Sequence, residues 1–375
     1  MQPAFEPQSV RRLLVVVPNW AGDVVLATPV LAALRAHFQH TRITYLMRRY
    51  VADVVDGGGW HDDAVHWPNR RGVLSEAQMF GLGGRLRSGR FDLAVLLTNS
   101  FRSAFVAMLA RIPRRVGYAR DGRGWLLTDK LHPPKRDGEF VPAPLLPYYV
   151  AIAERLGCRV RDTKLRLATT SEQEQAGENL IRHYGLDDGR PYAIINPGAA
   201  FGAAKCWPAE RFAELCDRLR DELALTCVLV GAPNEVPLMR EIARRAAAQP
   251  ICCDDPGTTL GSLKPLVRGS SLMVCNDTGP RHYAAAYDIP TVTIFGPTHQ
   301  AWTDTDYAGE IKIQIPVECG PCQLPTCPLD HRCMTGVSTD RVMSATRELL
   351  TRSGSRDDGR GAPLAATGPS PHRET

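Results

Sequence analysis

The sequence predicts an α/β protein made of two doubly wound parallel-sheet domains in series. Short apolar runs alternate with amphipathic stretches, a pattern typical of βαβ units. The alternation lapses over residues 159–190, which are charged and poor in apolar side chains, and it restarts at residue 192. The chain has 375 residues, a length that suits two domains of ordinary size.

The first half of the chain is expected to contain short strands rich in aliphatic residues. They span residues 12–17, 43–47, 64–67, 93–97 and 115–118. Helical patterns lie between and after them, at residues 24–38, 74–87, 101–110 and 148–156. Strands separated by helices pair in parallel, so we expect an N-terminal Rossmann-like domain over residues 1–165.

The second half repeats the pattern after a linker at residues 166–190, in which Ser171 and Glu174 would open a helix as a capping box. Strands are expected at residues 192–196, 226–230, 272–275 and 291–295, and helices at residues 209–222, 235–248, 280–287 and 341–351. A second Rossmann-like domain therefore covers residues 191–351. Residues 352–375 lack Val, Ile, Phe, Tyr and Trp, a composition that predicts a disordered tail.

The composition excludes several classes of protein. Hydrophobic residues make up 44% of the chain and charged residues 23%, as in ordinary globular proteins. No apolar run approaches the roughly 20 residues that span a bilayer, and none marks a secretory signal. We therefore expect a cytoplasmic protein with reduced cysteines. The net charge of +5 suits an anionic substrate or an acidic membrane surface and does not demand nucleic acid.

Lysine is scarce, so each lysine stands out against a background of arginine. Of the 45 basic residues, only six are lysine: Lys130, Lys135, Lys164, Lys205, Lys264 and Lys312. A position that keeps lysine where arginine is the local default is a candidate for a specific role.

The first candidate site follows the first strand, where residues 18–23 read Pro-Asn-Trp-Ala-Gly-Asp. Gly22 allows the backbone to approach a ligand closely. This turn is expected at the carboxyl edge of the sheet, facing the cleft between the domains. Asp23 can accept a proton there from an attacking hydroxyl. It can equally serve as the cap of the helix that follows.

A second candidate is the small-residue loop at residues 196–208 of the second domain. Its glycines and alanines, Gly198 among them, let phosphates come close, and Lys205 can neutralise their charge. The Walker A pattern is absent, so this is not a P-loop. The alternative is an ordinary loop with a solvated lysine.

A third candidate is the turn Asn-Asp-Thr-Gly-Pro-Arg-His at residues 276–282, between a buried strand and a helix. Backbone N–H groups at a helix start attract anions, and Thr278 with Gly279 suits a diphosphate. Arg281 or His282 would add positive charge. The alternative is a plain capped helix.

A fourth candidate lies in the first domain, after the strand at residues 93–97. Asn99, Ser100 and Arg102 follow that strand, and Arg120 with Arg123 is expected nearby. Amides and arginines at this edge can hold an anionic acceptor. A solvated basic rim is the alternative for each arginine.

The fifth feature is a cluster of cysteines near the C-terminus. Cys319, Cys322, Cys327 and Cys333 lie close together in sequence with His331 among them, but their spacing matches no common zinc finger. A structural zinc, redox-active thiols and merely clustered thiols all remain open.

Together these motifs resemble the bacterial lipopolysaccharide heptosyltransferases, and most closely the heptosyltransferase II branch of that family. Five blocks carry the resemblance in the family's order, at residues 18–23, 99–104, 197–208, 231–235 and 276–286. The resemblance implies the GT-B fold, in which two Rossmann-like domains face each other across a cleft and the C-terminal one binds the nucleotide donor. It also implies inverting transfer of a heptose from ADP-heptose to the lipopolysaccharide inner core, with no required metal.

The resemblance assigns roles to individual residues. Asp23 would be the catalytic base, and Lys205 would be catalytic by stabilising the departing diphosphate. The donor-binding residues would be Gly198, Lys205, Glu235, Asp277, Thr278, Gly279 and His282, with Glu235 placed for the ribose. The acceptor side would comprise Asn19, Asn99, Ser100, Arg102, Arg120 and Arg123. The partners implied are ADP-heptose and a lipid A–Kdo–heptose acceptor, met by a monomer at the cytoplasmic face of the inner membrane.

Other functions are open on the sequence alone. A different GT-B glycosyltransferase would use another nucleotide sugar or acceptor. A sugar-nucleotide epimerase shares the two-domain plan but needs a second acid or base in the cleft. A nucleotide-sugar-binding protein without enzymatic activity is a further alternative. A zinc-dependent nucleic-acid binder is disfavoured, because the chain lacks a basic and aromatic stripe.

Overall fold

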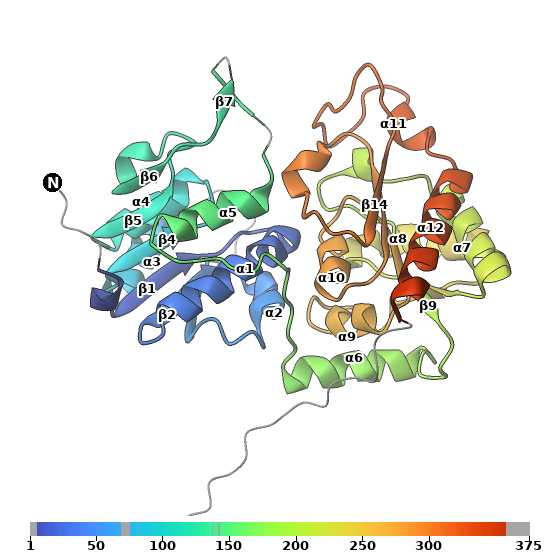
Figure 1. Ribbon diagram of the computed structural model, residues 1–375, viewed down its shortest axis with the longest axis horizontal. Helices are drawn as coiled ribbons and strands as arrows, with labels where there is room; N and C mark the ends of the chain where they lie inside the picture. The colour runs from blue at the N-terminus through green and yellow to red at the C-terminus, as the bar shows by residue number, and fades with distance from the viewer. Residues whose placement is uncertain (1–5, 69–75, 137, 142, 358–375) are drawn as a thin grey trace, which may run out of the picture.

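The computed structural model describes residues 6–68, 76–136, 138–141 and 143–357. It contains two α/β domains, each built on a six-stranded parallel sheet with helices on both faces (Figure 1). The strand orders are β3-β2-β1-β4-β5-β6 and β11-β10-β9-β12-β13-β14, so the first strand of each domain lies in the middle of its sheet. This is the strand order of dinucleotide-binding Rossmann folds. The predicted fold class is confirmed.

The first sheet is sandwiched between two helical layers. Its strands are β1 (Arg12–Val16), β2 (Arg42–Met47), β3 (Asp63–His66), β4 (Leu93–Leu96), β5 (Arg114–Tyr118) and β6 (Asp129–Leu131). Its helices are α1 (Ala21–His37), α2 (Ala52–Val55), α3 (Glu76–Ser88), α4 (Phe101–Leu109) and α5 (Leu145–Glu154). Side chains alternate along β1, so Leu13 and Val15 pack with α1 and α5, while Leu14 and Val16 pack with α3 and α4.

The second sheet repeats this plan after the linker helix α6 (Ser171–His183). Its strands are β9 (Tyr192–Asn196), β10 (Thr226–Leu229), β11 (Ile251–Cys252), β12 (Leu272–Asn276), β13 (Thr291–Phe295) and β14 (Glu310–Gln314). Its helices are α7 (Ala209–Leu223), α8 (Val236–Arg245), α9 (Leu263–Arg268), α10 (Arg281–Ala286), α11 (Arg332–Thr335) and α12 (Thr339–Asp357). Ile195 packs with α7, α8 and α12, whereas Ile194 packs with α9 and α10.

Several expected boundaries need correction. The capping box of α6 pairs Thr170 with Gln173, one residue earlier than predicted, and the Gln173 N–H donates to Thr170 Oγ1 at 3.2 Å. The final helix continues to Asp357, so residues 352–357 are helical and do not belong to a tail. The rest of the predicted tail, residues 358–375, lies outside the described part of the chain.

The sequence pattern also missed short elements at the edges of both sheets. β6, β11 and β14 were not expected, and the strand at residues 291–295 is therefore not the last of its sheet. Helices α2 and α9 were missed as well. Such short segments carry too few residues to show a clear period. Within the described residues, no helix has the length and apolar character needed to cross a bilayer.

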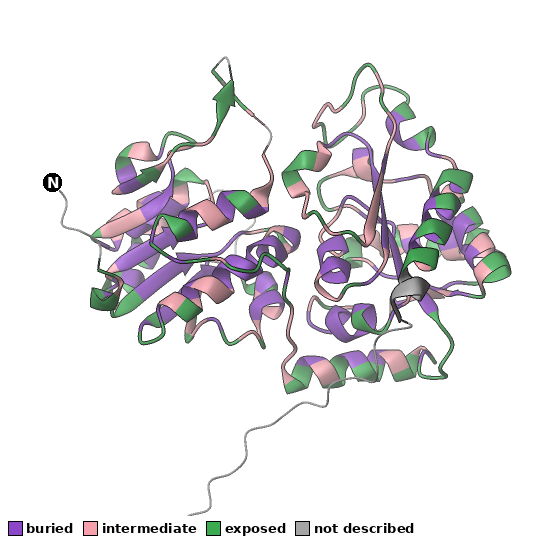
Figure 2. Cartoon of the chain, viewed as in Figure 1, coloured by how far each residue is buried: buried purple, intermediate pink, exposed green. Residues whose placement is uncertain are grey.

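The two domains share one apolar core. A single cluster of buried side chains joins α1 and α5 of the first domain to α9 and α10 of the second. The backbones of the two domains approach each other closely at Gly22 and Gly279: a Cβ atom on Gly22 would lie 3.0 Å from the Gly279 Cα and 3.0 Å from the His282 ring. Burial across this interface (Figure 2) holds the loops at the carboxyl edges of the two sheets face to face.

Lys264 ties three parts of the chain together at the linker end of the interface. Its ammonium group donates to the carbonyls of Asp56 at 3.0 Å and Ala168 at 2.6 Å, and to Gln173 Oε1 at 3.0 Å. These acceptors belong to the first domain, the linker and α6. The side chain is fully buried, and burial lowers the pKa of its ammonium to about 8. At pH 7 the group is therefore still protonated and can donate all three hydrogen bonds.

We expect Lys264→Met to lower the free energy of unfolding by about 2 kcal/mol, because methionine fills the space but leaves buried acceptors without a donor. The melting temperature measured at pH 7 tests this. Lys130→Met, at an exposed position of β6, is the matched control and should melt like the parent protein. Equal melting temperatures for both variants would show that Lys264 does not stabilise the domain arrangement.

Candidate active site

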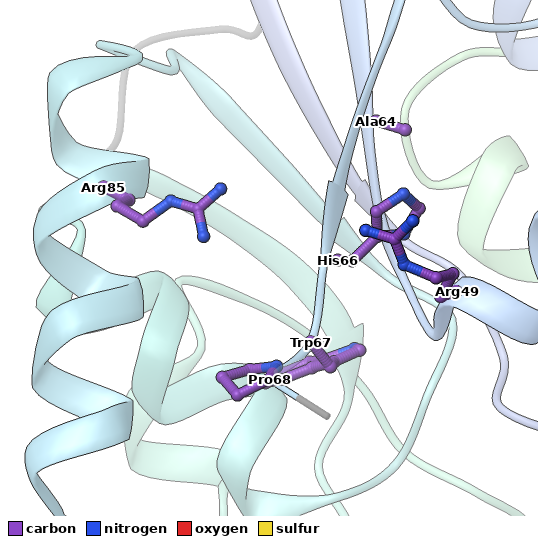
Figure 3. Close-up of a pocket in the computed structure, with 6 residues that line it drawn as sticks. All are labelled: Arg49, Ala64, His66, Trp67, Pro68 and Arg85. Carbon is purple, nitrogen blue, oxygen red and sulfur yellow. The ribbon is translucent and has the colours of Figure 1, made fainter. Parts of the chain in front are cut away.

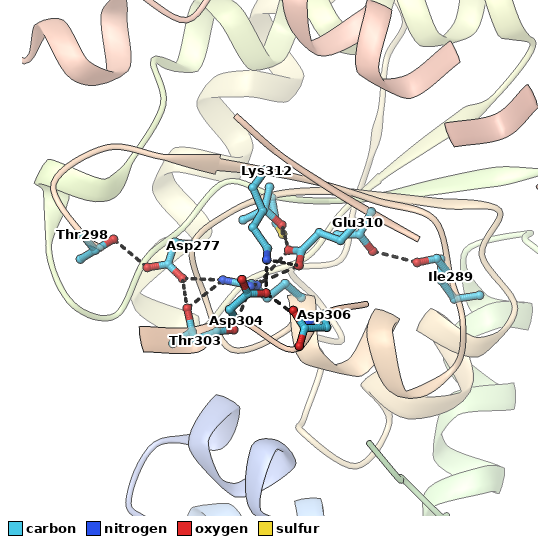
Figure 4. Close-up of polar contacts among 12 residues, drawn as sticks. Asp277, Ile289, Thr298, Thr303, Asp304, Asp306, Glu310 and Lys312 are labelled. Carbon is cyan, nitrogen blue, oxygen red and sulfur yellow. Dashed lines mark hydrogen bonds and ion pairs between the residues drawn. The ribbon is translucent and has the colours of Figure 1, made fainter. Parts of the chain in front are cut away.

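The carboxylate of Asp277 lies at the centre of a polar network at the end of β12 (Figure 4). Its Oδ2 atom lies 2.5 Å from the Lys205 ammonium and accepts the Thr298 hydroxyl at 2.8 Å. Its Oδ1 atom accepts from Arg281 at 3.0 Å. Although burial alone would raise the pKa of this carboxyl, the nearby charges of Lys205 and Arg281 hold it below its ordinary value. Asp277 is thus a permanent anion that orients a lysine.

The loop that carries Lys205 is fastened to the same strand end. The Asn276 side chain is fully buried and donates to the Pro197 carbonyl at 2.6 Å. Its Oδ1 atom accepts the Trp207 N–H at 3.1 Å. One amide therefore holds both ends of the loop, with Lys205 between them and only 11% of that side chain exposed.

The segment with the clustered cysteines, residues 319–333, also holds the loop that carries Lys205. The carbonyl of Pro325 accepts the Ala204 N–H at 3.0 Å, and His331 Nε2 lies 2.8 Å from the Ala204 carbonyl oxygen. Gly202 packs so closely that a Cβ atom there would lie 2.2 Å from the Pro325 oxygen. The segment therefore helps to set the position of Lys205.

Asp23 faces this network from the first domain. It occupies the first turn of α1, and the cap position belongs to Trp20, so the alternative reading of Asp23 as the helix cap is wrong. Burial mainly raises the pKa of its carboxyl to about 6; the charge of Asp277 adds to the rise and that of Lys205 opposes it. Charged groups of the second domain therefore affect the pKa of Asp23. A carboxylate with a pKa close to the working pH can act as a general base.

Glu235 and Gly198 are neighbours at the ends of β10 and β9. A Cβ atom on Gly198 would lie 2.0 Å from the Glu235 carboxyl carbon, so a larger residue there would have to displace that carboxylate. Glu235 Oε2 accepts the Ala232 N–H at 2.8 Å, and burial raises the pKa of its carboxyl. The structure therefore brings these two predicted residues together, and the ribose role of Glu235 stays a prediction.

Arg281 and His282 do not add free positive charge to the site, contrary to expectation. Arg281 is almost fully buried and also pairs with Glu310 at 3.0 Å. His282 is buried against Gly22, and burial, reinforced by the charge of Arg281, lowers its pKa well below the ordinary value. The imidazole is therefore neutral. Thr278 and Gly279 lie in the turn before α10, as predicted.

On the acceptor side, Arg123 differs from its prediction. Its guanidinium is fully buried and donates to the Tyr118 carbonyl at 2.9 Å, to Ser103 Oγ at 3.0 Å and to Asn99 Oδ1 at 3.3 Å. The Tyr148 hydroxyl also donates to Asn99 Oδ1, at 3.1 Å. Arg123 therefore holds the loop after β4 from beneath, and a direct contact with an acceptor would require these bonds to break.

The other predicted acceptor residues reach the surface. Ser100 is exposed and accepts the Ser103 N–H as the cap of α4, and Arg102 lies half-buried in the first turn of that helix. Arg120 lies over the Phe140 ring at 4.2 Å. Asn19 is half-buried, and its Oδ1 atom is buried without a hydrogen-bond partner in the described structure. Their binding roles stay predictions.

A separate cavity of about 290 Å³ opens at the end of β3 (Figure 3). Arg49 and Arg85 line it from two sides, together with His66, Trp67 and Pro68. None of these residues stands out in the sequence, because they come from separate segments that meet only in the fold.

The four clustered cysteines all carry free thiols, and only Cys333 is buried, whereas Cys319 is exposed and Cys322 and Cys327 are half-buried. Among the described residues, no group of three or more histidine, cysteine or carboxylate side chains is arranged to hold a metal ion. The side-chain positions thus give a structural zinc no support. That site stays a prediction, and elemental analysis of the purified protein tests it.

A model of the family described as "Glycosyltransferase family 9 (heptosyltransferase)" matches residues 79–332. The chain belongs to this family. It is 30% identical over 299 residues to lipopolysaccharide heptosyltransferase 2 of Salmonella typhimurium, covering 78% of this chain and 84% of that protein. The protein is thus a glycosyltransferase, as the motifs after the strands of both domains indicated.

Solved structures agree on the fold of this glycosyltransferase. The ADP-heptose lipopolysaccharide heptosyltransferase II of E. coli superposes with a TM-score of 0.74 at 24% identity, covering 92% of this chain and 99% of that one. A glycosyltransferase of the same family from Veillonella parvula gives a TM-score of 0.77 at 21% identity, with coverage of 91% and 97%. The GT-B arrangement that the resemblance implied is confirmed.

Sequence reasoning missed the residues that hold the site of this glycosyltransferase in place. Thr298 was not singled out, and Asn276 opened the third candidate turn without a role, because both act through contacts with distant loops that no local pattern reveals. Lys264 was marked only by the scarcity of lysine. His331 was noticed only as a neighbour of the cysteines in sequence. Its contact with the Ala204 carbonyl, in the loop that carries Lys205, is visible only in the folded structure.

We expect Gly22→Ala to reduce kcat/KM by about 10–100-fold, because the added methyl group presses on the Gly279 backbone and displaces Asp23 from the second domain. Steady-state kinetics on the purified variant test this. Gly81→Ala in α3 is the control, since a Cβ atom there meets nothing within 4 Å. A fully active Gly22→Ala enzyme would show that the close approach of the domains is not needed.

Proposed function

We propose that this glycosyltransferase moves a heptose from ADP-heptose to the inner core of lipopolysaccharide, as a heptosyltransferase II. The observation that carries the proposal is the placement of Asp23 in one domain opposite the Lys205–Asp277 pair in the other. The Salmonella relative bears the same activity in its name. The decisive experiment is incubation with ADP-heptose and a set of truncated core acceptors, followed by mass measurement of the products.

In this proposal Asp23 acts on the acceptor. Its carboxylate takes the proton from the acceptor hydroxyl while that oxygen bonds to the anomeric carbon of the heptose. The bond between that carbon and the diphosphate oxygen breaks at the same time, and ADP leaves with the electron pair. Attack from the face opposite ADP inverts the anomeric centre. One base and a stabilised leaving group are sufficient for such a displacement.

Lys205 supports the departure of ADP. Negative charge grows on the diphosphate as the bond to the sugar breaks, and an ammonium held in place beforehand stabilises that charge without reorganisation. Asp277 provides the orientation, and Arg281 with Thr298 keeps Asp277 itself fixed. We propose that Glu235 binds the ribose and that Thr278 and Gly279 line the diphosphate.

We propose that transfer requires no metal ion, because Lys205 supplies the positive charge. The chain does contain an Asp-x-Asp sequence at Asp304 and Asp306. It precedes β14, and Asp304 is already paired with Lys312 (Figure 4). Because the acceptor is lipid-linked in this proposal, the enzyme would work at the cytoplasmic face of the inner membrane. We also propose that it acts as a monomer.

The pH profile should report Asp23. A base with a pKa of about 6 loses its proton as pH rises, so kcat/KM should increase about tenfold per pH unit below 6 and level off above pH 7. Asp23→Asn should lower kcat by about 10²–10⁴-fold and leave ADP-heptose binding, measured by calorimetry, nearly unchanged. Full turnover by the asparagine variant would exclude Asp23 as the base.

Lys205→Ala should slow transfer by about 10²–10³-fold and weaken ADP-heptose binding, as expected for the loss of one donor at a developing anion. The fold should persist, because Arg281 and Thr298 still bind Asp277. Lys130→Ala serves as the matched exposed control. If kinetics and binding both match the parent enzyme, Lys205 is a bystander.

Activity should survive treatment with EDTA. Rates measured with and without the chelator, with circular dichroism to monitor the fold, make the comparison. If activity is lost while the dichroism spectrum is unchanged, a catalytic metal is required and the proposal is wrong on this point.

A further inference from the structure

The first domain carries an aromatic surface, formed by Phe80 of α3, Phe101 and Phe105 of α4 and Trp125 of the short helix Gly124–Leu126. The rings contact one another in a row: Phe80 and Phe105 have centroids 6.3 Å apart, Phe101 and Phe105 5.8 Å, and Phe101 and Trp125 6.2 Å. Phe80 is 57% exposed, Phe101 39% and Trp125 65%. Neighbouring aromatic side chains left this open to water mark an interaction site.

The helices beneath this surface are packed firmly. Leu82 and Leu86 of α3 and Val106 of α4 belong to the core against the first sheet. Gly83 lets the helices approach, since a Cβ atom there would lie 2.7 Å from the Leu109 Cβ. The exposed rings thus stand on a rigid base and are not part of an incomplete core.

The charged residues on α3 and α4, which carry three of the four rings, are mainly arginines. Arg85 and Arg87 of α3 are exposed and Arg102 of α4 is half-buried, and none of the three pairs with a carboxylate among the described residues. Arg85 also lines the cavity at the end of β3 together with Arg49 (Figure 3). In sequence, the only acid on α3 and α4 is Glu76.

This combination of aromatic rings and arginines selects the partner. A second copy of the chain would place the arginines of both copies at one interface with few acids to pair with them, which disfavours a self-complementary dimer. An anionic phospholipid bilayer offers apolar depth for the rings and phosphates for the arginines, and Trp in particular favours the boundary between lipid and water. We propose that the aromatic surface docks the enzyme on an anionic phospholipid bilayer.

Docking through the aromatic surface would place the predicted acceptor side of the enzyme next to the bilayer. This point rests on the proposed function. Phe101 directly follows Ser100 and the loop after β4, where the acceptor side was predicted. A bilayer that touches Phe101 would therefore present a lipid-linked acceptor at the edge of the cleft.

Flotation with vesicles tests the docking without ADP-heptose or acceptor, so its outcome is separate from that of the transfer reaction. The parent enzyme should bind vesicles of phosphatidylcholine and phosphatidylglycerol better than vesicles of phosphatidylcholine alone. Phe80→Ser combined with Trp125→Ser should weaken binding by about tenfold or more. Arg85→Gln combined with Arg87→Gln should remove the preference for phosphatidylglycerol. Leu329→Ser, at a residue of the second domain that is 60% exposed, is the control and should bind like the parent.

A second comparison separates docking from acceptor binding. The aromatic variant should keep the parent rate on a water-soluble core oligosaccharide and lose rate on acceptor embedded in vesicles. The proposal is overturned if the parent does not bind the anionic vesicles or if both double variants bind them as the parent does. An equal loss of rate on the soluble acceptor, or a parent dimer in sedimentation that the aromatic variant dissociates, would also overturn it.

Discussion

The buried carboxylate of Asp277 accepts bonds from Lys205, Arg281 and Thr298, and so one negative charge holds the Lys205 loop, the start of α10 and the loop after β13 together. Two cations share this anion, while Glu310 takes part of the charge of Arg281. The arrangement keeps Lys205 ordered before any ligand arrives, which is the condition for electrostatic catalysis without reorganisation. Its influence crosses the cleft, because the same carboxylate helps to raise the pKa of Asp23.

The two domains have the same strand order but contribute different kinds of residue to the site. In each, the central strand ends on the side that faces the other domain, β1 before Asp23 and β9 before the loop of Lys205. In the proposed mechanism, Asp23 of the first domain is the base, and Lys205 on its anchored loop in the second domain is the source of positive charge. Neither set is complete alone, so the apolar contact between α1 and α10 is as much a part of the site as the side chains themselves.

Much of this arrangement could be predicted from the sequence. The parts that could not be predicted depend on contacts between segments that are far apart in the chain. Asp23, Lys205 and Asp277 all lie in the connections between a buried strand and the helix after it, or in the first turn of that helix, so topology alone brings them to the carboxyl edges of the sheets. The state of Arg281 was not readable, because its burial depends on Glu310, which belongs to the unexpected edge strand β14. The exposure of Phe80 and Trp125 was equally hidden, since an apolar residue in a helical pattern predicts burial and only the fold shows which face is left open.

The buried lysine at the linker has a consequence for motion. Lys264 binds two backbone carbonyls and one amide, none of which titrates, so the attachment is insensitive to the protonation of its partners. It joins the domains at the end next to α6 and α9 (Figure 1), whereas Gly22 and Gly279 meet elsewhere on the interface. Because that end is held, a separation of the domains would be a rotation about the Lys264 attachment and not a slide.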